Sequence, residues 1–530
     1  MGYRRSDRSG ATSPFPPTVS DPMRRIQVQA IRPDVAARPV IAAASLTLLM
    51  VALAIVLFTA MRTPMKDDIA WLLYVARRWL AGRELYVDVI EVNPPLIVWI
   101  SAIPIQFSAW LGIDPQRVVI PYFAAMVLAC AGWTASLLRP CGSVFRHPWP
   151  VFAAIGTVLL LVPGDDLGQR EHLLVAAALP YLALFARRLD GERLRLATSI
   201  AAGVLAGLGC ALKPRYAAVF LALEVLSLIR GIRPWHAMPL AAAGTLVAYA
   251  GIVELICPAY MRRAVPLALA LYGATDVPFR HLLQDSARLL FGEAAAALLC
   301  WHRFRRQEDR TLLLTLVVFA VTATAVCFLD GKDWYYHRLP ATIATILALL
   351  TWAATTSLRR RAEIWPPALL AGSALLVLMV AAVQRLQPEV ALAVTPERST
   401  VVRLEELIRA EHARTYIAFS EWIALGFPVV NNTGVAWASR FDSMWALKGE
   451  LWRARFDPAA TKEWPVSRWV ANDFVAGCPD LAVVDTREGV NYIEVLSSSD
   501  RAFARAWARY RQIAAFDGLT VYHRAAGGCG

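Results

Sequence analysis

The chain has 530 residues, of which 57% are hydrophobic, and its formal net charge at pH 7 is +13. Its mean hydropathy of +0.46 excludes an ordinary soluble globular protein of this length. Much of the positive charge is arginine in the loops between apolar segments, and no RNA- or DNA-binding motif accompanies it. The charge therefore does not indicate nucleic acid as a partner, and the composition predicts a membrane protein.

The N-terminal residues 1–38 are rich in Arg, Pro and Ser and poor in apolar residues, which predicts a disordered cytoplasmic tail. The first apolar stretch, 39–60, is longer than the core of a signal peptide and lacks a small-x-small cleavage site. We therefore expect it to remain as a membrane anchor.

Apolar stretches of membrane length continue from there to residue 383, since a hydrocarbon core of about 30 Å needs about 20 helical residues. The predicted spans are 39–60, 118–138, 150–163, 172–186, 196–212, 216–229, 237–257, 286–301, 311–329, 339–357 and 366–383. A further stretch, 95–111, fits either a span or a segment that lies in the interface or dips in and returns. If it does not span, every arginine-rich cluster falls on one side. The positive-inside rule then predicts eleven spans and a cytoplasmic N-terminus.

The hydropathy changes character after residue 383, which divides a membrane domain, 39–383, from a soluble non-cytoplasmic α/β domain, 384–530. Short apolar runs at 416–419, 481–484 and 519–522 predict strands, and helical spacing marks 398–412 and 500–516. The domain has no glycine-rich phosphate loop and no catalytic triad, so we expect it to help bind an acceptor or shape the site. Its two cysteines, Cys478 and Cys529, could pair in an oxidising compartment.

The first acidic loop, 65–95, begins with Asp67 and Asp68, and an amphipathic stretch typical of an interfacial helix follows. One interpretation is that the two aspartates cap this helix. The other is that one of them is the carboxylate base that a sugar-hydroxyl acceptor needs. Glu91 and Asn93 stand in the same loop, before two prolines, where they could also be ordinary loop residues facing water.

The second acidic loop, 164–172, contains Asp165 and Asp166 and ends in Arg170, Glu171 and His172. Polar side chains at the start of a span are costly unless they line a wet cavity. In the eleven-span topology both acidic loops face the non-cytoplasmic side, which predicts a reaction centre between them.

Basic residues could supply an anion site beside these carboxylates. Lys213 and Arg215 end the fifth span on the non-cytoplasmic side, against the charge rule, and a lipid phosphate would suit them; simple snorkelling to the interface is the alternative. Tyr336, His337 and Arg338 lie in the polar segment 330–340, which could contact a sugar or a phosphate or be a wet surface loop.

Several short motifs, taken in this order, resemble the GT-C glycosyltransferases, which include the protein O-mannosyltransferases and the lipid A aminoarabinose transferases. The motifs are Asp68, Ala76, Gly82, Tyr86 and Asn93-Pro94-Pro95-Leu96, then Glu171-His172-Leu173-Leu174, then Gly207 to Pro214, then Tyr336-His337-Arg338-Leu339-Pro340. The resemblance covers most of 39–340. It implies a polytopic helical bundle with interfacial helices, a polyprenyl-phosphate sugar donor and a first-loop aspartate as the base. The Asp-Asp pair stands where Asp-Glu is commoner, so either aspartate could be that base.

The resemblance implies an inverting membrane glycosyltransferase of a bacterial inner or plasma membrane, acting on a cell-envelope glycan, glycolipid or protein acceptor. The predicted catalytic residues are Asp68 and Asp67, and the predicted substrate-binding residues are Glu91, Asn93, Asp165, Asp166, Arg170, Glu171, His172, Lys213, Arg215, Tyr336, His337 and Arg338. No cofactor is certain, although Glu91 and Glu171 could hold a divalent cation if one is used. The alternatives are a transporter or flippase of lipid-linked sugars, for which no inverted repeat is evident, and a scaffold or sensor, which would leave the acidic loops without a role.

Overall fold

The computed structural model describes residues 37–233, 235–305, 311–356, 361–457 and 460–525. The predicted tail lies outside the described residues except for its last two positions. Cys529 also lies outside them, whereas Cys478 is disulfide-bonded.

Each of the eleven predicted spans is occupied by a helix. They are α1 (Ala37–Arg62), α4 (Pro115–Leu137), α5 (Pro148–Leu161), α6 (Arg170–Leu189), α7 (Leu196–Leu212), α8 (Ala217–Ile229), α9 (Ala237–Ile256), α12 (Ala287–Arg305), α13 (Thr311–Asp330), α14 (Tyr335–Thr355) and α15 (Arg361–Val394). Seven helices of the described residues are long and apolar enough to cross a membrane. The ambiguous stretch 95–111 forms α3 (Pro95–Leu111), which is apolar but shorter, as are α5 and α7.

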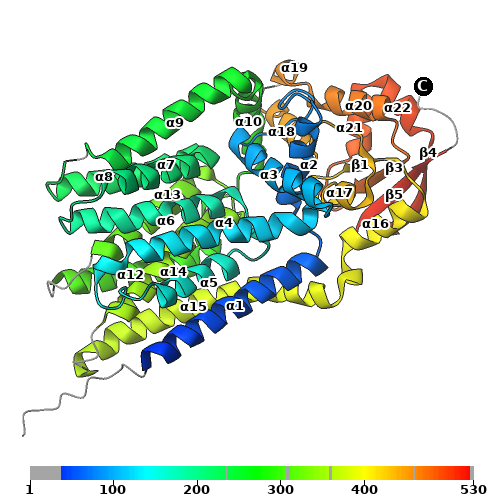
Figure 1. The fold of residues 1–530 in the computed structure, drawn as a ribbon. Coiled ribbons are helices and arrows are strands. Elements are labelled where there is room, and N and C mark those ends of the chain that lie inside the picture. Colours follow the sequence, from blue (N-terminus) through cyan, green and yellow to red (C-terminus); the bar gives the residue numbers. More distant parts are fainter. Residues whose placement is uncertain (1–36, 234, 306–310, 357–360, 458–459, 526–530) are drawn as a thin grey trace, which may run out of the picture. The chain divides into compact units, whose positions relative to one another are not determined.

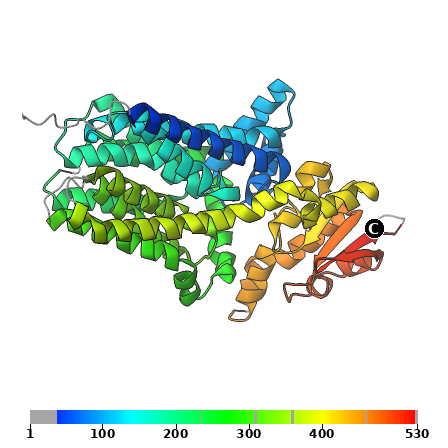
Figure 2. The same ribbon diagram turned by 90° about the horizontal axis from the view of Figure 1, so that it is seen from below.

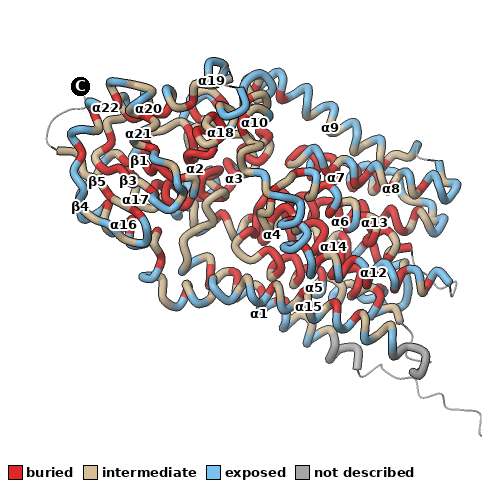
Figure 3. Tube along the Cα trace, turned by 180° about the vertical axis from the view of Figure 1, so that it is seen from behind, coloured by how far each residue is buried: buried red, intermediate tan, exposed pale blue. Residues whose placement is uncertain are grey.

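Helix α6 forms the centre of the bundle, between α4, α7, α13 and α14 (Figure 1). Nearly all of its side chains are buried, including the polar ones at its start. Helix α9 has the opposite character, since most of its apolar side chains are exposed (Figure 3). A helix that is apolar and exposed suits contact with lipid, whereas one that is buried all round belongs to the core.

Helices α7 and α9 pack closely because α7 carries glycines at the contact. A Cβ atom at Gly207 would stand 2.7 Å from the Ala242 carbonyl oxygen and 2.7 Å from Thr245 Cβ. One turn earlier, a Cβ at Gly203 would also meet the α9 backbone. Small residues four apart are a common means of close approach between membrane helices.

We expect Gly207→Ala to destabilise the protein by about 1–3 kcal/mol, because even one methyl group overpacks the contact between α7 and α9. Gly244→Ala is the matched control, since a Cβ there meets nothing within 4 Å. The control should be neutral or stabilising by up to about 1 kcal/mol, as alanine is the better helix former. Thermal unfolding of the detergent-solubilised variants measures both, and equal unfolding temperatures would contradict the close packing.

Shorter helices lie at the end of the bundle that carries the acidic loops. Helix α2 (Asp67–Leu80) begins directly at the paired aspartates and packs on α3. Helix α10 (Val265–Leu271) continues into a 3-10 turn, η6 (Tyr272–Thr275), on the C-terminal side of α9. Both α2 and η6 contact the C-terminal part of the chain.

The C-terminal part contains a five-stranded sheet in the order β2-β1-β3-β5-β4. Strands of this sheet are drawn as arrows among the helices of the same part (Figure 2). The strands are β1 (Thr415–Phe419), β2 (Ala436–Trp437), β3 (Leu481–Asp485), β4 (Tyr510–Phe516) and β5 (Leu519–Arg524). The β2-β1 and β1-β3 pairs are parallel and the β3-β5 and β5-β4 pairs antiparallel. Helices complete this part: α16 (Thr400–Ala410), α17 (Val429–Thr433), α18 (Trp445–Ala454), α19 (Ala460–Glu463), α20 (Val466–Gly477), α21 (Tyr492–Ser499) and α22 (Arg501–Trp507). The three predicted strands are therefore confirmed, as β1, β3 and β5.

The predicted helix over 500–516 is wrong in its second half. Helix α22 ends at Trp507, and residues 510–516 form strand β4, which pairs with β5. The turn between the two strands is Asp517-Gly518, with φ angles of +51° and +75°. An Asp-Gly pair between two runs of strand-forming residues is a strong hairpin signal, and it outweighs the helical spacing of the arginines.

Candidate active site

The two acidic loops contact each other. The Asp68 carboxylate accepts a hydrogen bond from the side-chain amide of Gln169, with 2.9 Å between Oδ2 and Nε2. The Lys66 ammonium lies 3.4 Å from Asp165 Oδ2 and 3.9 Å from Asp166 Oδ1. The start of α2 and the second acidic loop therefore share one charged cluster.

The paired aspartates differ in their surroundings. Asp67 Oδ1 accepts the Asp68 backbone N–H at 2.9 Å and lies 3.7 Å from the Lys66 ammonium. Burial raises the pKa of Asp67 to about 6, against the opposing effect of Lys66. The N-cap residue of α2 is Lys66, and α2 has no side-chain cap, so neither aspartate occupies the capping position that the first interpretation required. Both aspartates are half-buried, but Asp67 is paired with Lys66, whereas Asp68 turns its carboxylate toward the second loop. Asp68 is therefore the better placed to meet a substrate.

Helix α15 holds the second loop from the other side. The Arg385 guanidinium lies 3.2 Å from Asp165 Oδ1 and 3.2 Å from Asp166 Oδ2, and it stacks 3.8 Å above the Tyr335 ring centre. One turn later, Glu389 accepts the Asp165 backbone N–H at 3.0 Å. Burial and the neighbouring Asp165 raise the pKa of Asp166 to about 8, although Lys66 and Arg385 act against this.

Lys66, Arg385 and Glu389 were not among the predicted site residues. The sequence pattern that could have indicated Arg385 and Glu389 is their position four residues apart near the end of an apolar helix. Charged residues in such a helix usually have a partner or a function.

Glu91 and Asn93 brace the first acidic loop. Glu91 is 2% exposed and accepts three hydrogen bonds: from Trp71 Nε1 at 2.5 Å, from the Asn93 backbone N–H at 2.7 Å and from Asn93 Nδ2 at 2.6 Å. The Asn93 carbonyl accepts from the Tyr86 hydroxyl at 2.8 Å. Burial raises the pKa of Glu91 above its usual range. These contacts give both side chains a structural role in the first acidic loop.

A buried ionic cluster joins α6, α7, α13 and α14. Lys213 Nζ lies 2.5 Å from Glu171 Oε1, 3.0 Å from His337 Nε2 and 3.7 Å from Asp330 Oδ2. Arg215, whose side chain is 60% exposed, pairs with Asp330. The Tyr216 hydroxyl donates to the His337 carbonyl at 2.8 Å. Asp330, the last residue of α13, was not among the predicted site residues. Its contacts with Lys213 and Arg215 make it a member of this cluster.

Arg170 and Arg338 have guanidinium N–H groups without a hydrogen-bond partner among the described residues. Arg170 is 6% exposed, and its Nε atom is unpartnered; its guanidinium carbon lies 6.0 Å from the Tyr336 ring centre. Arg338 donates from Nη2 to the Asp333 carbonyl at 2.8 Å, but its Nε and Nη1 atoms are unpartnered. A buried, unsatisfied guanidinium donor is costly, so it marks a place where an anion would be stabilised.

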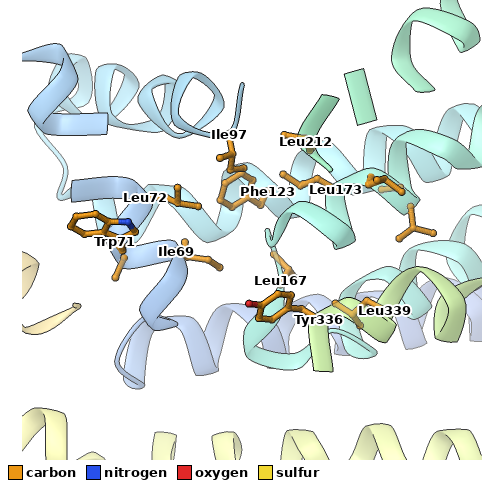
Figure 4. Packing of buried hydrophobic residues seen from close by; sticks show 14 of the residues in the cluster. Ile69, Trp71, Leu72, Ile97, Phe123, Leu167, Leu173, Leu212, Tyr336 and Leu339 are labelled. Atoms are coloured by element: carbon orange, nitrogen blue, oxygen red, sulfur yellow. The ribbon is translucent and has the colours of Figure 1, made fainter. Parts of the chain in front are cut away.

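His172 belongs to the packing of the second loop. Its Nδ1 atom accepts the Gly168 backbone N–H at 3.2 Å. Gly168 has φ +99°, and a Cβ there would stand 2.4 Å from the Phe123 ring, so only glycine fits. Figure 4 shows Phe123 among the apolar side chains between α2, α3 and α6 that hold this end of the bundle together.

The structure thus brings Asp67, Asp68, Asp165 and Asp166 into one cluster and Glu171, Lys213, Arg215 and His337 into a second. The segment 169–171 connects them, because Gln169 contacts Asp68 and Glu171 contacts Lys213. Within the described residues, no group of three or more His, Cys, Asp or Glu side chains is arranged to hold a metal ion.

No protein-family model matches the sequence, and no curated protein matches it. Solved structures do match the fold, and two of them are of ArnT from Cupriavidus metallidurans. The structure bound to undecaprenyl phosphate has 11% sequence identity and a TM-score of 0.55, and the match covers 91% of this chain and 98% of that one. The apo structure has 12% identity, a TM-score of 0.53 and the same coverage.

The fold is similar to that of ArnT. ArnT is a lipid A aminoarabinose transferase and a GT-C enzyme, so the resemblance to the GT-C fold drawn from the sequence motifs is confirmed. The match extends well beyond residue 340, where the motif resemblance ended, and therefore includes most of the C-terminal part. At this low identity the likeness shows the fold alone.

Proposed function

We propose that this protein is an integral membrane glycosyltransferase that transfers a sugar from a polyprenyl-phosphate donor to an acceptor hydroxyl on the non-cytoplasmic face. The observation that carries the proposal is that the Asp68 carboxylate lies close enough to interact with Arg170, and that Nε of Arg170 and Nε and Nη1 of Arg338 have no hydrogen-bond partner among the described residues. The fold adds support, because ArnT was crystallised with undecaprenyl phosphate.

The proposed reaction is a single displacement with inversion. Asp68 accepts the proton of the acceptor hydroxyl as its oxygen attacks the anomeric carbon of the donor sugar. The bond between that carbon and the phosphate oxygen breaks, and the polyprenyl phosphate leaves with the bonding electron pair. Arg170 and Arg338 stabilise the negative charge that develops on the phosphate.

Lys213 and Arg215 contribute positive potential to the same region. Lys213 already has Glu171 as a close partner, so one of its roles is to stabilise the buried cluster. Its positive charge also attracts the phosphate. Arg215 is more exposed and can turn toward a bound anion. In this proposal Glu171 fixes the lysine, and Tyr336 forms part of the wall on which the sugar packs.

The proposed orientation has the N-terminus in the cytoplasm and the C-terminal sheet outside it. Its support is the arginine at the end of the bundle opposite Asp68, such as Arg187 and Arg188 in the last turn of α6. Arg188, for example, ends α6 at the opposite end from the site, where it pairs with Glu224 and donates to the Arg233 carbonyl at 2.7 Å. This distribution follows the positive-inside rule.

The decisive experiment uses the purified full-length protein, undecaprenyl-phosphate-linked sugars as donors, and glycan, glycolipid and protein fractions of the cell envelope as acceptors. Free undecaprenyl phosphate should be released only when an acceptor is present, and the sugar should appear on that acceptor by mass spectrometry. A flippase would instead move intact donor across a proteoliposome bilayer. Measurable flipping with no donor cleavage under any acceptor would overturn the enzymatic proposal.

A further inference from the structure

The segment 438–444, between β2 and α18, lies against the first acidic loop. The Arg440 carbonyl accepts the Ile90 backbone N–H at 2.8 Å. The Arg440 guanidinium is fixed in turn by Asp473 of α20, with 2.6 Å between Nη2 and Oδ1. At the other end, the Met444 backbone N–H donates to the carbonyl of Ser420, directly after β1, at 2.8 Å. Contacts on both sides therefore fix this segment.

Further contacts fix the C-terminal part on α2, the helix that carries Asp68. Asn431 Nδ2 donates to the Ala70 carbonyl at 2.8 Å. The Phe427 ring packs on Trp71, with 4.8 Å between ring centres, and on Tyr74, with 4.9 Å. These contacts begin within one helical turn of Asp68, so they set the position of the 438–444 segment relative to the proposed base.

Aromatic rings extend the same surface toward α14. Trp445, the first residue of α18, meets Tyr272 edge-on, with 5.1 Å between ring centres. Tyr272 meets Trp334 at 5.8 Å, and Trp334 stacks on Tyr336 at 5.9 Å. The ring series thus runs from the C-terminal part to Tyr336, whose ring lies beside the Arg170 guanidinium.

Asp442 lies in the fixed segment, next to Trp445, the first ring of this series. Its Oδ1 atom accepts from Trp445 Nε1 at 2.9 Å and from the Ser443 hydroxyl at 3.4 Å. The titratable groups close enough to interact with its carboxyl are Glu91 of the first loop, Asp68 of α2 and Tyr272 of η6. Asp442 is therefore a carboxyl group from a different part of the chain that lies close enough to interact with the proposed base.

We propose that Asp442 is a substrate-binding residue of this active site, supplied by the C-terminal part, and that its carboxyl group hydrogen-bonds a hydroxyl of the transferred sugar or of a saccharide acceptor beside Asp68. The inference rests on the proposed function. It assigns the C-terminal part a direct contact with substrate, whereas the sequence indicated only that it would shape the site or help bind an acceptor.

The surroundings of Asp442 favour the neutral carboxyl. Burial, with the nearby Glu91 and Asp68 carboxylates, raises its pKa well above the usual value. A protonated carboxyl can donate a hydrogen bond to a substrate hydroxyl, whereas the Asp68 carboxylate can only accept one. Two carboxyls with opposite tasks in one site, set apart by their environments, are a known arrangement in enzymes.

The test compares Asp442→Asn with Asp442→Ala in the donor-release assay. Asparagine keeps a hydrogen-bond donor and no charge, so we expect it to retain most of the turnover at neutral pH. Alanine removes the donor and should lower turnover by about 10- to 100-fold. Glu406→Gln, an exposed carboxyl on α16, is the matched control and should match the unmodified protein.

The pH profile separates substrate binding from a purely structural role. If the neutral carboxyl is the working form, turnover falls as the pH rises through the folded-state pKa of Asp442, and Asp442→Asn removes that fall. Thermal stabilisation by undecaprenyl phosphate should stay unchanged in both variants, which shows that the fold and lipid site are intact.

Full turnover in Asp442→Ala would overturn the inference, as would an Asp442→Asn variant as inactive as alanine. An unchanged alkaline limb in Asp442→Asn would also overturn it. Failure of the unmodified protein to release undecaprenyl phosphate would instead overturn the proposed function, and this inference with it.

Discussion

Replacement of Asp68 by Asn is expected to lower sugar transfer by about 100- to 10,000-fold, the usual cost of losing a general base. The amide can still contact Gln169, so the α2 start and the second loop should keep their geometry. Donor release by the purified protein measures the loss, and its abundance in the membrane should be unchanged.

Asp67→Asn tests which of the two aspartates is the base. Asp67 contacts Lys66 and the Asp68 backbone N–H, so its replacement should affect local stability more than the chemical step. We expect its effect on transfer to be at least tenfold smaller than that of Asp68→Asn. If Asp68→Asn is fully active, Asp68 is not the base; if Asp67→Asn alone is inactive, the two aspartates have exchanged roles.

Replacement of Lys213 by Ala is expected to destabilise the protein by about 3–5 kcal/mol, because it leaves a buried carboxylate without its cation. Glu171 is fully buried, and its closest cation is Lys213 at 2.5 Å. Thermal unfolding in detergent measures the loss. Lys213→Arg should retain part of the stability, since it keeps the charge but has a different geometry.

The double variant Lys213→Met with Glu171→Gln is the test of that cause. Removal of both charges should restore much of the stability lost in Lys213→Ala, because neither partner is then left charged and unpaired. A double variant no more stable than Lys213→Ala would show that the pair does not account for the loss. Transfer should remain impaired in the double variant even where stability returns.

The positions of the helices could be predicted from the sequence because each span must be apolar over a membrane-determined length. The acidic loops could be predicted for a related reason, since clustered carboxylates at helix boundaries contrast with the apolar residues around them. Strands β1, β3 and β5 are short apolar runs bounded by polar residues and stood out in the same way. Strand β4 did not, because most of its side chains are not buried and it follows Arg501, Arg505 and Arg509, which are spaced as on a surface helix.

Pairings between distant residues could not be read from the sequence. Lys213 indicated an anion, but nothing local identifies Glu171, 42 residues earlier, as its closest partner. Asp442 follows Phe441 in a segment of no regular pattern, and its importance arises only because the Arg440 carbonyl meets Ile90. Such contacts depend on how the chain folds back on itself, which hydrophobic periodicity does not encode.

The contacts of Phe427 and Asn431 with α2 have a consequence for biosynthesis. The ribosome delivers Asp68 early, but the rings of Trp71 and Tyr74 are covered only after residue 427 has emerged and the later sheet has folded. The proposed site is therefore complete only after the C-terminal part has folded onto α2. A chain truncated after α15 would carry the membrane helices of the described residues but would lack the 438–444 segment of the proposed site.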